Sequence, residues 1–248
     1  MNIGRVNILI PMAGAGSRFQ NAGFREPKPL IDVGGKPMIK WAMESFDFLD
    51  RVLSYRLIFI ISKDHDEEHK LGKRLKGIFG KGIILIIAKT PTRGQAETCL
   101  LAERYIDNQE KLFIYNCDTY SRSKILDLIV KEDPDGIIPC FKSRNPRYSY
   151  AKEGVNGFVR EVAEKKAISN FATTGMYYFK HGQDFVEAAK SILLGKKLTN
   201  KEFYVGPCYN ELIKKGKKIR AIMSEKNFIL GTPRELEKFI RRLDSLKL

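Results

Sequence analysis

The chain has 248 residues, 43% of them apolar, and a formal net charge of +15. It is long enough for a sizeable core, has no run of about 18 apolar residues that could span a membrane, and begins without a signal segment, so we expect a cytoplasmic protein. Its lysines and arginines are scattered rather than interleaved with aromatic residues, so we predict no nucleic-acid partner.

Strand-like and helix-like segments alternate in the first half of the chain. Unbroken apolar runs predict strands at 6–10, 57–61, 83–88 and 112–115. Apolar periodicity and charge predict intervening helices after residue 37, at 64–75 and at 95–105. This alternation predicts right-handed βαβ units and a mostly parallel sheet, whose ligands bind beyond the carboxyl ends of the strands.

The second half has a less regular rhythm. Its predicted strands are 137–141, the region around 148–150, 158–162, 172–179 and 218–223, and its predicted helices are 181–193 and about 205–215. The segment Thr232-Pro-Arg-Glu235 is a capping box with proline at the first helical position, so it predicts the start of a final helix. We find no linker, and we predict one domain over residues 1–248.

The most informative segment, residues 11–19, follows the first strand. Its small residues, which form a turn that lets backbone N–H groups approach an anion closely, are Ala13, Gly14 and Gly16. Two cations follow, Arg18 and then Lys28, which stands between two prolines. The segment is not a Walker A motif, which ends in Gly-Lys-Ser/Thr, nor a dinucleotide fingerprint, because Phe19 occupies the place of the third glycine.

Residues 14–19, taken together with Pro27-Lys-Pro-Leu30, resemble the signature of the sugar-nucleotide pyrophosphorylases. These nucleotidyltransferases join a nucleoside triphosphate to a sugar phosphate. The resemblance covers nearly the whole chain and implies a Rossmann-like three-layer α/β/α sandwich with a mostly parallel mixed central sheet. It implies a nucleotide-binding half over about 1–135 and an acceptor-binding half over about 136–248. It also implies that Arg18 holds the leaving β- and γ-phosphates and that Lys28 neutralises the reacting phosphates.

The resemblance extends to the base and acceptor sites. It implies that Gln95 hydrogen-bonds the nucleobase edge and that Gly94 lets the base lie close. It further implies that Glu164 accepts hydrogen bonds from acceptor hydroxyls, that Lys165 pairs with the acceptor phosphate, and that Gly175 leaves room for the acceptor ring. Without the resemblance, these segments would be a helix start and a solvated charged run.

The expected cofactor is Mg²⁺, and Asp118 is its first candidate ligand because it ends an apolar strand where the family has an aspartate. A strand-ending turn residue is the alternative interpretation of Asp118. Relatives that act on sugar 1-phosphates have a second metal-binding aspartate two residues before a late Gly-Thr, where this chain has Ile229. Glu225 and Asn227 lie on the same strand face and are the candidates to replace it.

Cysteines and histidines suggest no further chemistry. The cysteines form no Cys-x-x-Cys pair, so we expect no zinc or iron–sulfur site; they are Cys99, Cys117, Cys140 and Cys208. His65 and His69 share a helix face without a third ligand nearby, and we predict that they are solvated.

The first hypothesis is therefore a magnesium-dependent nucleotidyltransferase that takes a nucleoside triphosphate and a sugar phosphate. An alternative is a cytidylyltransferase acting on a phosphorylated alcohol such as phosphocholine. A third is a non-catalytic, nucleotide-binding regulatory subunit, which the joint presence of Arg18, Lys28 and Asp118 argues against. The sequence leaves open the base, the acceptor and whether the protein is a homo-oligomer.

Overall fold

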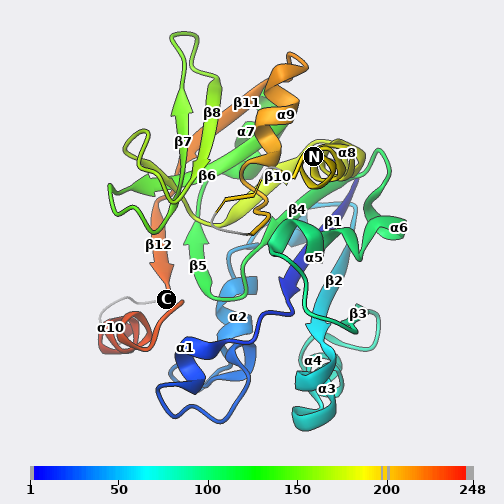
Figure 1. The fold of residues 1–248 in the computed structure, drawn as a ribbon, viewed down its shortest axis with the longest axis vertical. Coiled ribbons are helices and arrows are strands. Elements are labelled where there is room, and N and C mark those ends of the chain that lie inside the picture. The colour runs from blue at the N-terminus through cyan, green and yellow to red at the C-terminus, as the bar shows by residue number, and fades with distance from the viewer. Residues whose placement is uncertain (1–2, 197, 200–201, 244–248) are drawn as a thin grey trace.

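The computed structural model describes residues 3–196, 198–199 and 202–243, and it shows a central sheet with helices on both faces (Figure 1). The strands are β1 Arg5–Met12, β2 Ser54–Ser62, β3 Ile84–Ala88, β4 Lys111–Tyr115, β5 Thr119–Arg122, β6 Gly136–Lys142, β7 Ser149–Glu153, β8 Val159–Glu164, β9 Phe171–Thr173, β10 Met176–Phe179, β11 Ile219–Met223 and β12 Lys226–Ile229. The α-helices are α1 Ser17–Gln20, α2 Met38–Met43, α3 Lys63–His69, α4 Leu71–Phe79, α5 Gln95–Leu100, α6 Glu103–Ile106, α7 Ile125–Glu132, α8 Gly182–Leu194, α9 Cys208–Lys214 and α10 Pro233–Leu243. Two 3₁₀ turns, η1 and η2, span Lys28–Leu30 and Leu49–Arg51.

The large sheet is mixed, as predicted. Its strand order is β3-β2-β1-β4-β10-β6-β9-β7-β8, and β11 also pairs with β6. The strands of the first half pair in parallel, whereas β10 is antiparallel to both β4 and β6. Parallel β1 to β4 end at one edge of the sheet, so the loops that follow them lie together.

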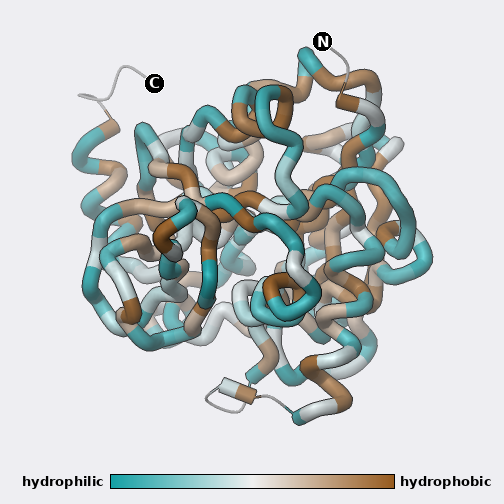
Figure 2. The backbone as a smooth tube through the Cα atoms, turned by 90° about the horizontal axis from the view of Figure 1, so that it is seen from above, coloured by the Kyte–Doolittle hydropathy of each residue, from teal (hydrophilic) through white to brown (hydrophobic). Residues whose placement is uncertain are grey.

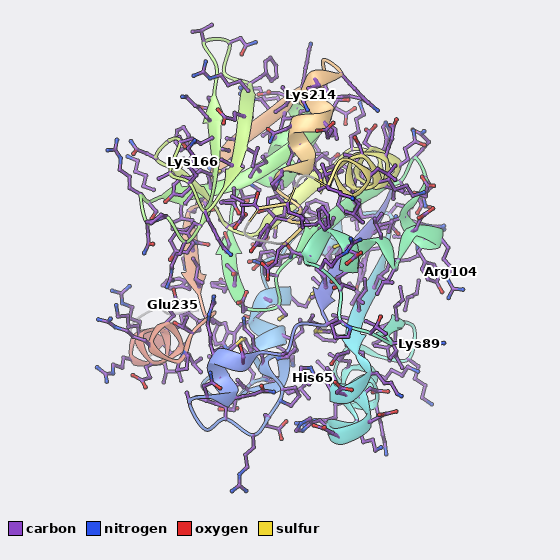
Figure 3. All side chains as sticks on the ribbon, in the orientation of Figure 1. His65, Lys89, Arg104, Lys166, Lys214 and Glu235 are labelled. Atoms are coloured by element: carbon purple, nitrogen blue, oxygen red, sulfur yellow. The ribbon has the colours of Figure 1, made fainter. Side chains whose placement is uncertain are left out.

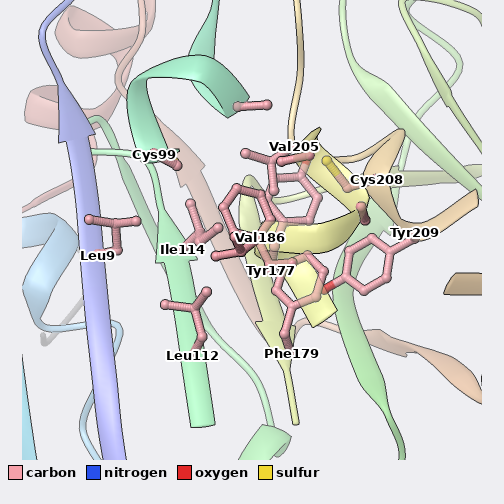
Figure 4. Packing of buried hydrophobic residues seen from close by; sticks show 14 of the residues in the cluster. Leu9, Cys99, Leu112, Ile114, Tyr177, Phe179, Val186, Val205, Cys208 and Tyr209 are labelled. Atoms are coloured by element: carbon pink, nitrogen blue, oxygen red, sulfur yellow. The ribbon is translucent and has the colours of Figure 1, made fainter. Parts of the chain in front are cut away.

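Alternation along β1 separates the core into two layers. Leu9 belongs to the cluster that α5, α8 and α9 cover, while Ile8 and Ile10 belong to the cluster under α2, α4 and α7. Figure 4 shows the first of these clusters, in which the rings of Phe179 and Tyr209 stack with their centroids 4.5 Å apart. Hydrophilic segments lie mainly in the peripheral loops (Figure 2). Each fully buried aliphatic side chain contributes about 1.5–3 kcal/mol to folding, so both faces of the sheet are firmly held.

A third cluster connects the two ends of the chain. Phe19 of α1, Trp41 of α2, Tyr120 of β5 and Phe239 of α10 all belong to it. The Trp41 and Phe239 rings meet edge to face, 5.0 Å apart, and the Trp41 Nε1–H donates to the Val33 carbonyl at 2.8 Å. This packing holds α10 beside the loop that follows β1.

Three predicted elements are each divided in the structure. The helix expected at 64–75 breaks at Lys70, which has a left-handed backbone, because the Asp66 carboxylate accepts a hydrogen bond from the Gly72 N–H and starts α4. The strand expected at 172–179 turns at Gly175, so that β9 pairs with β7 and β10 with β4. The helix expected at 95–105 ends at residue 100, and α6 follows it.

Two further observations concern membrane-spanning helices and the state of the cysteines. No helix over the described residues is long and apolar enough to cross a membrane. The four cysteines are free and buried, and burial raises the pKa of the Cys117 thiol to about 12.

Candidate active site

A cavity of about 990 Å³ lies where the loops after β1, β2, β3 and β4 meet the second half of the chain. Figure 3 labels three of its lining residues, His65 on α3, Lys89 directly after β3 and Glu235 on α10. The predicted site residues that line the cavity are Ala13, Gly14, Gly16, Arg18, Lys28, Gly94, Gln95, Asp118, Glu164 and Gly175. Segments as distant in sequence as Ala13 and Gly175 thus share one cavity.

The glycine loop forms one wall of this cavity. Gly16 has a left-handed backbone with φ of 69°, and α1 begins directly after it. The Phe19 N–H bonds to the Gly16 carbonyl at 2.9 Å, so the loop is closed by a turn of helix. Arg18 lies exposed on α1 and makes no hydrogen bond or ion pair within the described part of the chain. Its guanidinium is available to an anion.

Lys28 and Asp118 form an ion pair in the cavity. The Lys28 ammonium donates to Asp118 Oδ2, and the two side chains are only 20% and 16% exposed. Desolvation by burial lowers the pKa of Lys28, but the charge of Asp118, the nearby Cys117 and the hydrogen bond to Asp118 together hold that pKa above its usual value. Lys28 is therefore charged at neutral pH. The prolines on either side of Lys28 stiffen its backbone, and η1 starts there.

The predicted base-reading segment contacts the end of β4. The Gln95 Nε2–H donates to Asn116 Oδ1 at 2.7 Å. Gly94 and Gly175 each also have a structural reason to be glycine, beside the predicted roles. A Cβ on Gly94 would lie 2.5 Å from both the backbone N and O of Phe203, and a Cβ on Gly175 would overlap the Asn116 amide. Both glycines have positive φ, so the fold requires them independently of any ligand.

Gly94→Ala is expected to destabilise the protein by at least about 3 kcal/mol, because the new Cβ meets the Phe203 backbone and φ is +129°. Urea unfolding measures this change. Gly77→Ala is the matched control, because nothing lies within 4 Å of its Cβ position inside α4, and it should stabilise the protein by about 0.5–1 kcal/mol. Equal stability of the Gly94→Ala and unmutated proteins would contradict the close approach.

The opposite end of the cavity is lined by hydroxyls and carboxylates. The Ser149 hydroxyl donates to Glu164, and the Tyr177 hydroxyl lies 3.4 Å from the Ser149 Oγ. Burial raises the pKa of Glu164, which has no ion pair with any residue that the structure describes. Lys165 does not line the cavity: its ammonium donates to the Tyr204 hydroxyl at 2.5 Å.

The two candidates for a second metal ligand lie outside the cavity. Glu225 is 57% exposed and pairs with Lys124 at 3.6 Å. Asn227 has a buried Oδ1 without a hydrogen-bond partner, but it does not line the cavity either. Ile229, in contrast, lines the cavity next to Asp118. Over residues 3–196, 198–199 and 202–243, no three His, Cys, Asp or Glu side chains lie close enough together to hold a metal ion.

The pattern of the Nucleotidyl transferase family matches residues 8–237. The chain belongs to this family. The catalytic subunit beta of mannose-1-phosphate guanylyltransferase from Danio rerio is 25% identical over 183 residues, which are 69% of this chain and 49% of that protein. The chain therefore spans about half the length of this curated relative.

Solved structures agree with this assignment. A nucleoside-diphosphate-sugar pyrophosphorylase from Vibrio cholerae RC9 superposes with a TM-score of 0.80 at 29% identity, over 94% of this chain and 99% of the other. The inositol-1-phosphate CTP transferase from T. maritima has a TM-score of 0.74 at 17% identity, over 97% and 96% of the two chains, and shares the fold. The predicted family and the Rossmann-like α/β/α fold are confirmed.

His65 and Glu235 are among the cavity residues whose place in the site the sequence analysis did not predict. His65 was predicted to be solvated, but it is only 6% exposed, because α3 places it against the Ala15 carbonyl of the glycine loop. Burial lowers the pKa of His65. Glu235 was assigned only to a capping box, and the structure shows one of its two bonds: the Glu235 N–H donates to Thr232 Oγ1 at 3.3 Å, while the Glu235 carboxylate accepts from the Thr232 hydroxyl. The sequence pattern of a helix cap does not predict that the Glu235 carboxylate also lines the cavity.

Proposed function

We propose that this nucleotidyl transferase joins a nucleoside triphosphate to a sugar phosphate and releases pyrophosphate. The observation that carries the proposal is the Lys28–Asp118 pair, which lies in the cavity between the glycine loop and the hydroxyl-lined end. The relatives named above include a guanylyltransferase for mannose 1-phosphate and a nucleoside-diphosphate-sugar pyrophosphorylase, which supports a sugar phosphate as the acceptor.

The reaction is an in-line attack of an acceptor phosphate oxygen on the α-phosphorus. Negative charge grows on the non-bridging and leaving oxygens, so positioning and electrostatic neutralisation provide the catalysis. The backbone N–H groups of the glycine loop cradle the phosphates. Arg18 holds the leaving β- and γ-phosphates, and Lys28 turns from Asp118 toward the reacting phosphates.

Asp118 fits the expected magnesium ion. Its carboxylate already carries a cation, the Lys28 ammonium, inside a cavity large enough for a nucleotide. Magnesium bound to polyphosphate needs only one or two protein carboxylates. When bound, it would neutralise phosphate oxygens, which is the same kind of charge that Arg18 and Lys28 neutralise.

The remaining predicted residues have roles at the two ends of the cavity, where the acceptor and the base bind. Glu164 accepts hydrogen bonds from acceptor hydroxyls, and it is available for them because no described residue forms an ion pair with it. Lys165 reaches the acceptor phosphate after leaving Tyr204, and Gly175 leaves room for the acceptor ring. Gly94 and Gln95 border the base. The buried free thiols suit a reducing compartment, which supports a cytoplasmic location.

Gln95→Leu is expected to change the ratio of kcat/KM among the four ribonucleoside triphosphates by about tenfold while changing the best kcat less, because base contacts are shared by ground and transition states. Gln183→Leu, an exposed substitution on α8, is the control. Unchanged preference among the four triphosphates in Gln95→Leu would remove Gln95 from the base site.

The deciding experiment for the function measures pyrophosphate release with each triphosphate against a panel of sugar phosphates and phosphorylated alcohols. Release with at least one sugar phosphate supports the proposal. Binding of a triphosphate without any release would instead favour the non-catalytic subunit.

One observation favours the cytidylyltransferase as a second candidate. At the acceptor end, the Lys165 ammonium lies 4.9 Å from the centre of the Tyr204 ring, and the Arg147 guanidinium lies 4.8 Å from that of Tyr148. Aromatic rings that already make cation–π contacts with these side chains can also bind a quaternary ammonium group. Phosphocholine therefore belongs in the panel, and release with CTP and phosphocholine alone would establish this alternative.

A further inference from the structure

We infer that Glu235 provides the second carboxylate of a divalent-cation site whose first is Asp118, in place of the aspartate that Ile229 replaces. The inference rests on the proposed function, because it concerns the metal of the same reaction. It is carried by three observations: the gap at Gly231, the elements that border this gap, and the cations that the two carboxylates already bind.

Gly231 leaves a gap that both carboxylates border. The position of a Cβ on Gly231 is 2.9 Å from Asp118 Oδ2 and 3.7 Å from Glu235 Oε2. The same position is 3.6 Å from Cγ2 of Ile229. An acid at residue 229 would therefore reach the gap that Glu235 reaches from α10. A side chain at residue 231 would fill it.

The fold holds these groups in place from two sides. β12 pairs with β5 so that Ile229 stands opposite Thr119, and the Leu230 N–H donates to the Asp118 carbonyl at 2.7 Å. On the other side, the Thr232 hydroxyl donates to Glu235 Oε2 at 2.8 Å. The buried Phe239 anchors α10 in the third core cluster. Rigid elements on both sides are what a metal site requires.

Both carboxylates already form ion pairs with cationic side chains of the same protein. Lys28 pairs with Asp118, and Arg147 pairs with Glu235 Oε1. The Glu235 side chain is only 18% exposed, so its charge needs a partner. All four side chains line the cavity. The phosphates of the two substrates compete for Lys28 and Arg147, which leaves Asp118 and Glu235 to a divalent cation. Anions and metal therefore enter this site together.

The test uses Mn²⁺ as the probe, titrated into the full chain with and without inorganic pyrophosphate, and follows bound Mn²⁺ by its electron paramagnetic resonance spectrum. Glu235→Gln keeps a capping-box residue at this position but removes the charge. It is expected to raise the Kd of Mn²⁺ in the presence of pyrophosphate at least about tenfold. Glu237→Gln, exposed on the same helix, is the matched control and should leave the Kd unchanged.

Two more variants separate a metal ligand from a structural ion pair. Arg147→Gln also breaks the Arg147–Glu235 pair, but it frees the carboxylate, so Mn²⁺ without pyrophosphate should bind more tightly. Ile229→Asp added to Glu235→Gln should restore the affinity, because it returns an acid to the same gap. Either of two results would overturn the inference: unchanged Mn²⁺ affinity in Glu235→Gln, or a loss of Mn²⁺ affinity in Arg147→Gln as large as the loss in Glu235→Gln.

These results are distinguishable from a failure of the proposed function. If the unmutated protein releases no pyrophosphate with any substrate pair while Glu235→Gln still weakens Mn²⁺ binding, the cation site stands and the reaction does not. If pyrophosphate release is normal and Glu235→Gln binds Mn²⁺ as the unmutated protein does, the reaction stands and Glu235 is only a capping residue.

Discussion

Asp118→Asn is expected to lower pyrophosphate release at least about a thousandfold, or roughly 4 kcal/mol of barrier, at any workable magnesium concentration. Asparagine has nearly the same shape but removes the charge that pairs with Lys28 and that would hold the metal. The remaining acid in the gap, Glu235, is longer and also bonded to Thr232, so it cannot take over both tasks. Initial rates over a magnesium series measure the effect.

Asp127→Asn is the control for this change, because it makes the same chemical substitution on an exposed face of α7. Its rate should match that of the unmutated protein. Calorimetry adds a second measurement: the unmutated protein should bind magnesium tightly only when triphosphate or product is present, because Lys28 otherwise occupies Asp118. A folded Asp118→Asn protein with ordinary turnover would show that this carboxylate is a strand-end turn residue.

Lys28→Ala is expected to lower turnover at least about tenfold, equivalent to roughly 1.4 kcal/mol of barrier, while the fold stays intact. The ammonium is buried, charged and held within reach of the phosphates by flanking prolines, so no solvent ion can replace it in the same position. The substitution also frees Asp118, so less magnesium should be needed for half-maximal rate. A lower kcat with a lower magnesium requirement is a combination that a purely structural lysine would not produce.

Lys73→Ala on the exposed face of α4 is the control and should change neither quantity. Because Lys28 and Asp118 touch, the double mutant Lys28→Ala/Asp118→Asn should be much less impaired than the sum of the two single losses. Additive losses, or a folded Lys28→Ala protein at normal turnover, would remove Lys28 from the reaction.

The sequence by itself determined the features that depend on neighbouring residues. Apolar runs that alternate with helical patterns identify the parallel first half, because a buried strand needs an unbroken apolar stretch. The glycine loop, Lys28 and Asp118 could be located because each follows directly from a strand or a proline-stiffened segment. Parallel strands end at one edge, so their meeting in a single cavity also follows from the order of the elements.

Only the tertiary structure decided what depends on contacts between distant segments. Gly94 needs to be glycine because Phe203, more than a hundred residues later, runs against it. Gly175 separates β9 from β10, which both pair with β6 but whose second partners are β7 and β4. Glu235 satisfies a local capping rule, and nothing within its own helix indicates that packing on Trp41 also turns it toward Asp118. Local propensity describes how a segment folds, whereas the partners across a cavity are set by the packing of the whole chain.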